Sequence, residues 1–85
     1  MDYGVVVYSS TTTTNRAKKI AESKIPSLRV FQLPTNIGLK GCNYSLRCEY
    51  SALELLRSIS TQYDLKIKAV FRESMKDGKK VYDRL

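Results

Sequence analysis

The residues of this chain best suited to chemistry are two cysteines, and both lie in one short stretch, Gly41–Cys48, GCNYSLRC. If Cys42 and Cys48 occupy one strand, six steps of about 3.3 Å separate them by about 20 Å. A disulfide needs Cα atoms within about 7 Å, and zinc ligands must come about as close. We therefore expect neither a disulfide nor a metal site from this pair.

Conventional enzyme chemistry has little support in the composition. The chain has no histidine, which removes the commonest general base, the Ser-His and Cys-His nucleophile pairs and most zinc sites. The eight acidic residues show no paired-carboxylate spacing, and no phosphate-binding glycine motif is present. We expect a protein that is not an enzyme and that needs no metal and no cofactor.

Apolar patterning predicts strands and helices in the order βαββαβ. Strands are expected over 3–8, 28–33, 43–48 and 65–72, with helices from residue 11 or 12 to before Pro26 and over 49–61. In the fourth strand mostly charged residues alternate with apolar ones, which are Leu65, Ile67, Ala69 and Phe71. This alternation predicts a sheet that is covered on one side only. Asp77-Gly78 could turn the chain into a short extra strand. This order predicts an α+β, ferredoxin-like sandwich with a four-stranded antiparallel sheet and two helices on one face.

The whole chain of 85 residues reads as a single domain, with a core over 3–72 and a C-terminal turn or tail over 73–85. No signal-peptide core and no run of about 20 apolar residues is visible, so we expect a cytoplasmic protein without a membrane partner. The net charge of +7 either favours an acidic partner or serves solubility.

The expected fold gives the two cysteines different surroundings. On the third strand, Cys48 shares the core face with Tyr44 and Leu46 and reads as a small buried hydrophobe. The right-handed crossover rule brings Ser9–Thr14, at the start of the first helix, next to Pro34–Cys42. A helix N-terminus and a cation such as Lys40 both lower a thiol pKa. Cys42 is then either a reactive thiol or a partly buried structural one.

The start of the first helix also has two interpretations. Ser10, Thr11 and Thr12 supply hydroxyls that either cap the helix or help to line an anion pocket at its positive end. Arg47 falls about 17 Å along the strand from Cys42 and on the opposite face. It is either an exposed charge or a docking contact for an acidic partner.

Over about residues 3–72 the sequence resembles the small bacterial selenium/sulfur (Se/S) carrier-like proteins. Their pattern is an aromatic strand end followed by Ser-Thr, a helix, a Pro-x-x-Ile loop and a Cys-Gly-x-Ala-Leu-Arg segment that enters the third strand. The matching positions are Tyr8, Ser10, Thr11, Pro34, Ile37, Cys42, Leu46 and Arg47. The chain departs from the pattern at Asn43, where the family favours glycine, and at Ser45, where it favours alanine.

The resemblance implies a carrier that holds sulfur or selenium on Cys42 as a persulfide or selenopersulfide. Its partners would be a donor, such as a cysteine desulfurase-like or selenium-delivering protein, and an acceptor. Ser10, Thr11, Thr12 and Lys40 would stabilise the anion. Pro34, Gly38 and Gly41 would shape an accessible loop, and Arg47 would dock the partner.

Two other functions stay open. The same strand order occurs in RNA-recognition modules, and Lys40, Gly41 and Tyr44 loosely match their third-strand signature. Cys42 and Arg47 replace the stacking aromatics of that signature, so Tyr3 or Tyr8 would have to supply the stacking ring. The other alternative is a small regulatory or assembly domain without chemistry, which would form a homodimer through a sheet edge or face.

Overall fold

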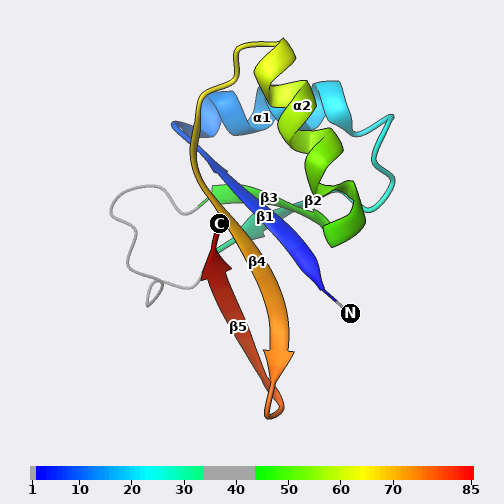
Figure 1. The fold of residues 1–85 in the computed structure, drawn as a ribbon. Helices are drawn as coiled ribbons and strands as arrows, with labels where there is room; N and C mark the ends of the chain where they lie inside the picture. The colour runs from blue at the N-terminus through cyan, green and yellow to red at the C-terminus, as the bar shows by residue number, and fades with distance from the viewer. Residues whose placement is uncertain (1, 34–43) are drawn as a thin grey trace.

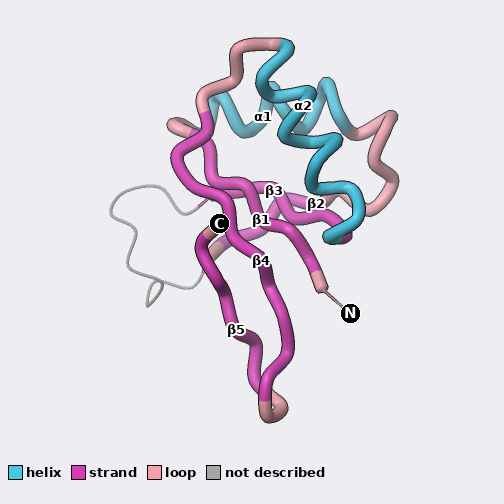
Figure 2. The backbone as a smooth tube through the Cα atoms, viewed as in Figure 1, coloured by secondary structure: helices cyan, strands magenta, loops and turns pink. Residues whose placement is uncertain are grey.

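The computed structural model of the chain describes residues 2–33 and 44–85 (Figures 1 and 2). The elements follow one another as β1 Tyr3–Tyr8, α1 Thr11–Ala21, β2 Arg29–Gln32, β3 Tyr44–Glu49, α2 Leu53–Gln62, β4 Ile67–Lys76 and β5 Lys79–Arg84. A short 3₁₀ turn over Tyr50–Ala52 leads into α2. The predicted α+β class is confirmed.

Within residues 2–33 and 44–85 the sheet has five strands in the order β2-β3-β1-β4-β5, and each neighbouring pair is antiparallel. The ferredoxin-like sheet of four strands is therefore matched only in part, because the possible extra strand after Asp77-Gly78 is present as β5 and extends the sheet beyond β4. The extra strand follows a two-residue turn in which Asp77 has φ 52° and Gly78 has φ 77°. Two consecutive positive φ values fit a tight hairpin, and Asp-Gly is a preferred sequence for it.

Both helices cover the same face of the sheet (Figure 1). Ala17 and Ala21 of α1 and Leu56 of α2 pack with Val6 of β1 and Leu46 of β3 in one buried cluster. α1 is amphipathic with small buried residues, which lets it lie close to the sheet. The helix-covered face therefore holds the main core, as predicted for Leu46.

The opposite face of the sheet has a buried cluster of its own. Val5 and Val7 of β1, Leu33, and Ala69 and Phe71 of β4 form this second cluster. The expectation of a sheet covered on one side only is wrong, because these side chains are nearly inaccessible to solvent. Phe31 of β2 and Tyr82 of β5 pack against the cluster.

A β-bulge explains how β4 serves both clusters. Val7 pairs with Ala69 and Tyr8 with Ile67, so Lys68 is an extra residue in the ladder. Ile67 packs against the helix-covered core, whereas Ala69 joins the second cluster. The uninterrupted alternation predicted over 65–72 is wrong, because the extra residue moves the odd-numbered side chains to the other face.

Candidate functional site

Several predicted site residues lie outside the described part of the chain. Pro34, Gly38, Lys40, Gly41 and Cys42 fall in the segment 34–43, as does the expected approach of that segment to the first helix. Their assigned roles stay predictions. The described residues on either side fix where the segment leaves and re-enters the sheet.

The strands before and after that segment, β2 and β3, pair with each other, and β3 contacts α1. Gln32, at the end of β2, pairs with Tyr44 at the start of β3. The Tyr44 hydroxyl donates to Asn15 Oδ1 in the first half of α1, over 2.9 Å. Tyr44 follows Cys42 by two residues in the sequence. Tyr44, the first described residue after Cys42, is therefore hydrogen-bonded to α1, the helix whose start was predicted to lie near Cys42.

Ser10 is the N-cap of α1. Its backbone is extended, with φ −156° and ψ 164°, and its Oγ accepts a hydrogen bond from the Thr13 backbone N–H at 3.1 Å. The Thr14 hydroxyl donates to the Ser10 carbonyl oxygen at 2.9 Å. Thr11 and Thr12 are exposed in the first turn. Ser10 thus performs the capping function that was one of its two interpretations.

Cys48 lies in the core beneath the helices and is 1% exposed. Burial, with a smaller contribution from the charge of Glu49, raises the pKa of its thiol to about 11. At neutral pH it is a thiol and not a thiolate, and the thiolate is the nucleophile. The prediction that Cys48 is a buried hydrophobe is confirmed.

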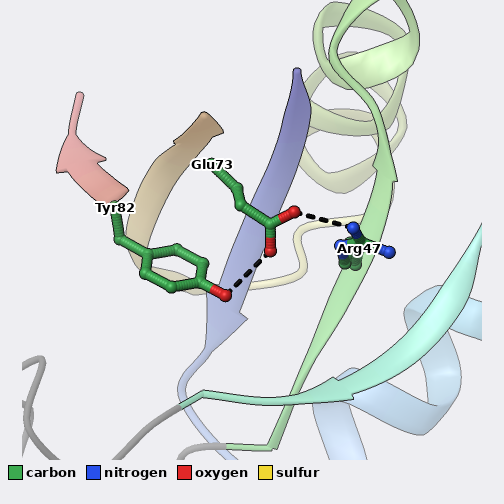
Figure 3. Close-up of polar contacts among 3 residues, drawn as sticks. All are labelled: Arg47, Glu73 and Tyr82. Carbon is green, nitrogen blue, oxygen red and sulfur yellow. Dashed lines mark hydrogen bonds and ion pairs between the residues drawn. The ribbon is translucent and has the colours of Figure 1, made fainter. Parts of the chain in front are cut away.

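Arg47 lies on the other face of β3 and takes part in a polar network (Figure 3). Its Nη2 donates to Glu73 Oε2 at 2.7 Å, and the Tyr82 hydroxyl donates to Glu73 Oε1 at 2.8 Å. The Arg47 guanidinium lies 3.7 Å from the centre of the Tyr3 ring and 5.6 Å from that of Phe31. Its side chain is 24% exposed, so it is not the freely exposed charge considered from the sequence.

This network joins three strands around one buried carboxylate. Glu73 of β4 is 3% exposed and receives donors from β3 and β5. Burial opposes its ionisation, but the hydrogen bonds from Arg47 and Tyr82 outweigh burial and hold its pKa below the ordinary value. Burial and the bond to Glu73 raise the pKa of Tyr82 to about 12. Within the described residues, Arg47 Nε is buried without a hydrogen-bond partner.

Sequence reasoning missed Glu73, Tyr82 and the partner role of Tyr3. Glu73 lies beyond the predicted end of the fourth strand, at residue 72. A signal was available, because Glu73 continues the alternation of Ala69 and Phe71 and so places one carboxylate on an apolar face. A buried carboxylate requires donors, and Arg47 was already expected on the face opposite Leu46.

Two further observations concern the described residues only. None of their helices is long and apolar enough to cross a bilayer. No group of three or more acidic or cysteine side chains in this part of the chain gathers as a metal site would require.

Comparison with known proteins identifies a family. Residues 3–72 match the family described as "Putative Se/S carrier protein-like". The match includes Cys42 and both helices, and it ends within β4, before β5. No curated protein and no solved structure matches the chain significantly.

Proposed function

Because the chain belongs to the Se/S carrier-like family, we propose that it carries sulfur or selenium on Cys42 and passes it between partner proteins. The observation that supports the choice of residue is the state of the other cysteine. The chain has two cysteines, and Cys48 is buried with a thiol pKa of about 11. A thiol carrier built from this sequence would therefore have to use Cys42.

The proposed chemistry is thiol exchange on a persulfide. The Cys42 thiolate attacks the outer sulfur of a donor persulfide, the donor S–S bond breaks, and the donor thiolate leaves. Cys42 then holds a persulfide, or a selenopersulfide when the donor delivers selenium. Attack by an acceptor thiolate on the outer atom returns Cys42 as a thiolate. No oxidant or reductant is consumed in either transfer.

Surrounding groups have supporting roles in this proposal. The amino end of α1, capped by Ser10, has Thr11 and Thr12 exposed in its first turn. Together with Lys40 they would stabilise a terminal persulfide anion. Pro34, Gly38 and Gly41 would keep the thiol accessible. Docking by Arg47 stays a prediction, and in this structure its guanidinium is already paired with Glu73.

The structure offers little for the nucleic-acid alternative on the sheet. Base stacking would need the ring of Tyr3 or Tyr8. The Tyr3 ring carries the Arg47 guanidinium, and Tyr8 is buried among the helices with its hydroxyl 2.7 Å from Ser60 Oγ. We therefore do not propose RNA binding through these tyrosines.

The carrier role is tested by mass spectrometry of the unreduced protein after incubation with a cysteine desulfurase and cysteine, then with a selenium donor. We expect a labile adduct of one sulfur or selenium atom on the peptide containing Cys42, which is lost on reduction. Cys48→Ala is the matched variant that should load normally, whereas Cys42→Ser should not. If Cys42 acquired no sulfur or selenium under conditions that load an established carrier, the proposed carrier function would be rejected.

A further inference from the structure

The strand β5 forms one edge of the sheet and pairs with β4 alone in the described part of the chain. It is six residues long and belongs to a hairpin that extends away from the helices (Figure 1). Lys79, Lys80, Asp83 and Arg84 are exposed, and Val81 is partly exposed. An open edge of this length is a template for pairing with another strand.

The direction of the edge groups follows from the hairpin. Leu85 donates its backbone N–H to the Val70 carbonyl, so this pair is hydrogen-bonded toward β4. Since hydrogen-bonded pairs alternate along an antiparallel ladder, Lys79, Val81 and Asp83 also direct their backbone groups to β4. The backbone groups of Lys80, Tyr82 and Arg84 then point outward, where an added strand would meet them.

A second copy of the chain could add its own β5 antiparallel to this edge, about a two-fold axis perpendicular to the sheet. Such an axis keeps each side chain on its own face, so residues of like parity pair. The axis must therefore lie midway between the two copies of one residue of β5, and each arrangement is named here by that residue. Three axis positions near the middle of the strand differ sharply in the charges that they bring together.

Two of these positions are unfavourable. An axis at Lys80 places this lysine opposite the same residue of the second copy. An axis at Tyr82 places Lys80 opposite Arg84 of the second copy, twice, and Val81 opposite Asp83. Like charges directly opposite each other in a ladder are destabilising.

An axis at Val81 gives a complementary pairing. Val81 meets Val81 of the second copy, each Lys79 meets an Asp83, and each Lys80 meets a Tyr82. Lys79 and Asp83 form no ion pair within the described part of the chain. Asp83 lies opposite Arg72 in the β4–β5 ladder, and Arg72 is itself paired with Asp2. Edge lysines ordinarily oppose pairing, but in this register each of them meets a favourable partner.

We propose that two copies of the protein pair antiparallel through β5, with the two copies of Val81 facing each other across the two-fold axis and reciprocal Lys79–Asp83 ion pairs on either side. The two five-stranded sheets then form one continuous sheet with all four helices on one face. This contact is small and polar, which makes it a weak, concentration-dependent dimer. The proposal does not depend on the carrier role.

A charge swap tests the ion pairs. Lys79→Asp and Asp83→Lys each place like charges at both sites, and each should weaken the dimer by roughly tenfold or more in a sedimentation-equilibrium series. The double variant restores opposite charges and should recover the wild-type association. Lys24→Asp and Glu22→Lys, which make the same charge changes on exposed residues away from β5, should have no such effect. A double variant as weak as the single ones would overturn the proposed register.

Cross-linking tests the axis. In a Cys42→Ser background, Val81→Cys should form an intermolecular disulfide on mild oxidation, because non-hydrogen-bonded pairs bring Cα atoms to about 4.5 Å. Lys79→Cys is the matched control on the same edge, and its two copies would lie about 13 Å apart. Equal cross-linking of the two variants would overturn the proposal. So would a wild-type protein that stays monomeric, together with no cross-linking of either variant.

Discussion

At the scale of single residues, the most demanding side chain is the buried carboxylate of Glu73. Burying an unpaired carboxylate is strongly unfavourable, and the fold meets the requirement with one donor from β3 and one from β5. The Arg47 guanidinium is in turn held against Tyr3. Each member of the network therefore restricts the position of the next.

Replacement of Tyr82 by phenylalanine removes one of the two donors and leaves the ring in place. We expect Tyr82→Phe to lower the free energy of unfolding by about 1–2 kcal/mol, because a buried acceptor loses its partner. Chemical denaturation measures the change. Tyr63→Phe alters a tyrosine that is 40% exposed and should change stability by less than about 0.5 kcal/mol. Equal losses in the two variants would contradict the role given to the Tyr82 hydroxyl.

The same network predicts an acid-sensitive stability. The folded pKa of Glu73 lies below its unfolded value, which is about 4.3. Its contribution is therefore complete above the unfolded pKa and is lost as pH falls through the folded pKa. We expect Glu73→Gln to flatten the fall in unfolding free energy below about pH 4.5. If the unfolding free energy of the variant fell with pH as steeply as that of the wild type, other carboxylates would be responsible for the loss of stability in acid.

Cys48 predicts a loss of stability on the alkaline side. Its folded pKa of about 11 exceeds the ordinary thiol value, so stability is retained at neutral pH and falls as pH rises toward the folded pKa. We expect Cys48→Ala to be less stable than the wild type at pH 7, with a difference that shrinks toward about pH 11. Denaturation of both proteins at several pH values measures it. A constant difference would mean that the thiol does not titrate in this range.

At the scale of elements, the approach of α2 to β1 depends on a missing side chain. A Cβ added at Gly4 would lie 2.8 Å from Leu53 Cδ1 and 3.0 Å from Leu53 Cβ. Leu53 is 3% exposed and has little room to move. The first turn of α2 therefore rests directly on the backbone of β1.

We expect Gly4→Ala to destabilise the protein by about 1–3 kcal/mol through overpacking. Thermal unfolding of a double-mutant cycle with Leu53→Ala measures the cause, because a shorter side chain makes room for the new methyl group. The cost of Gly4→Ala should be smaller in the Leu53→Ala background. Strictly additive losses would show that the two positions do not collide.

Local patterns predicted the type and place of most elements. β1 was predicted with its observed bounds, and α1 begins at Thr11 as one of two expected positions. The second helix begins later than predicted, because Tyr50–Ala52 form a 3₁₀ turn and Ala52 is the N-cap of α2. Competition between a 3₁₀ and an α turn over three residues depends on packing that the sequence does not display.

Tertiary contacts decided the features that were missed. The extra ladder residue at Lys68 arises from pairing with β1, so no pattern within β4 announces it. The helix-free face was expected to be open, because its cluster draws single residues from distant segments. For the candidate site, the sequence correctly separated Cys48 from Arg47 by strand parity. The place of Cys42 remains a prediction.

At the scale of the whole molecule, β5 belongs to the same sheet as the other strands although it lies outside the family match. The match ends at residue 72, whereas Tyr82 reaches back to Glu73 and packs with Phe31 at a ring distance of 6.2 Å. The sequence left open a turn, a tail or a short extra strand for the C-terminal segment, and the structure shows the strand. It covers one side of the second cluster.

We expect a chain that ends after Lys76 to be less stable than Tyr82→Phe, with a loss of about 3 kcal/mol or more. The truncation removes the hydroxyl donor, the ring and a whole strand of ladder hydrogen bonds. Urea denaturation compares the two proteins. A truncated chain as stable as the wild type would show that β5 does not contribute to stability. It would also contradict the role given to the Tyr82 hydroxyl as a donor to Glu73.

The bulge at Lys68 has a consequence for insertions and deletions. Loss of one residue within a regular strand moves all the following side chains to the opposite face of the sheet, so buried residues become exposed. Loss of residue 68 would instead leave Ile67 directly before Ala69, one on each face, as they already lie. Before residue 68 the odd-numbered side chains of β4 face the helices, and after it they face the second cluster. Related chains one residue shorter at this point would keep both cores, and an alignment gap belongs there before anywhere else in the strand.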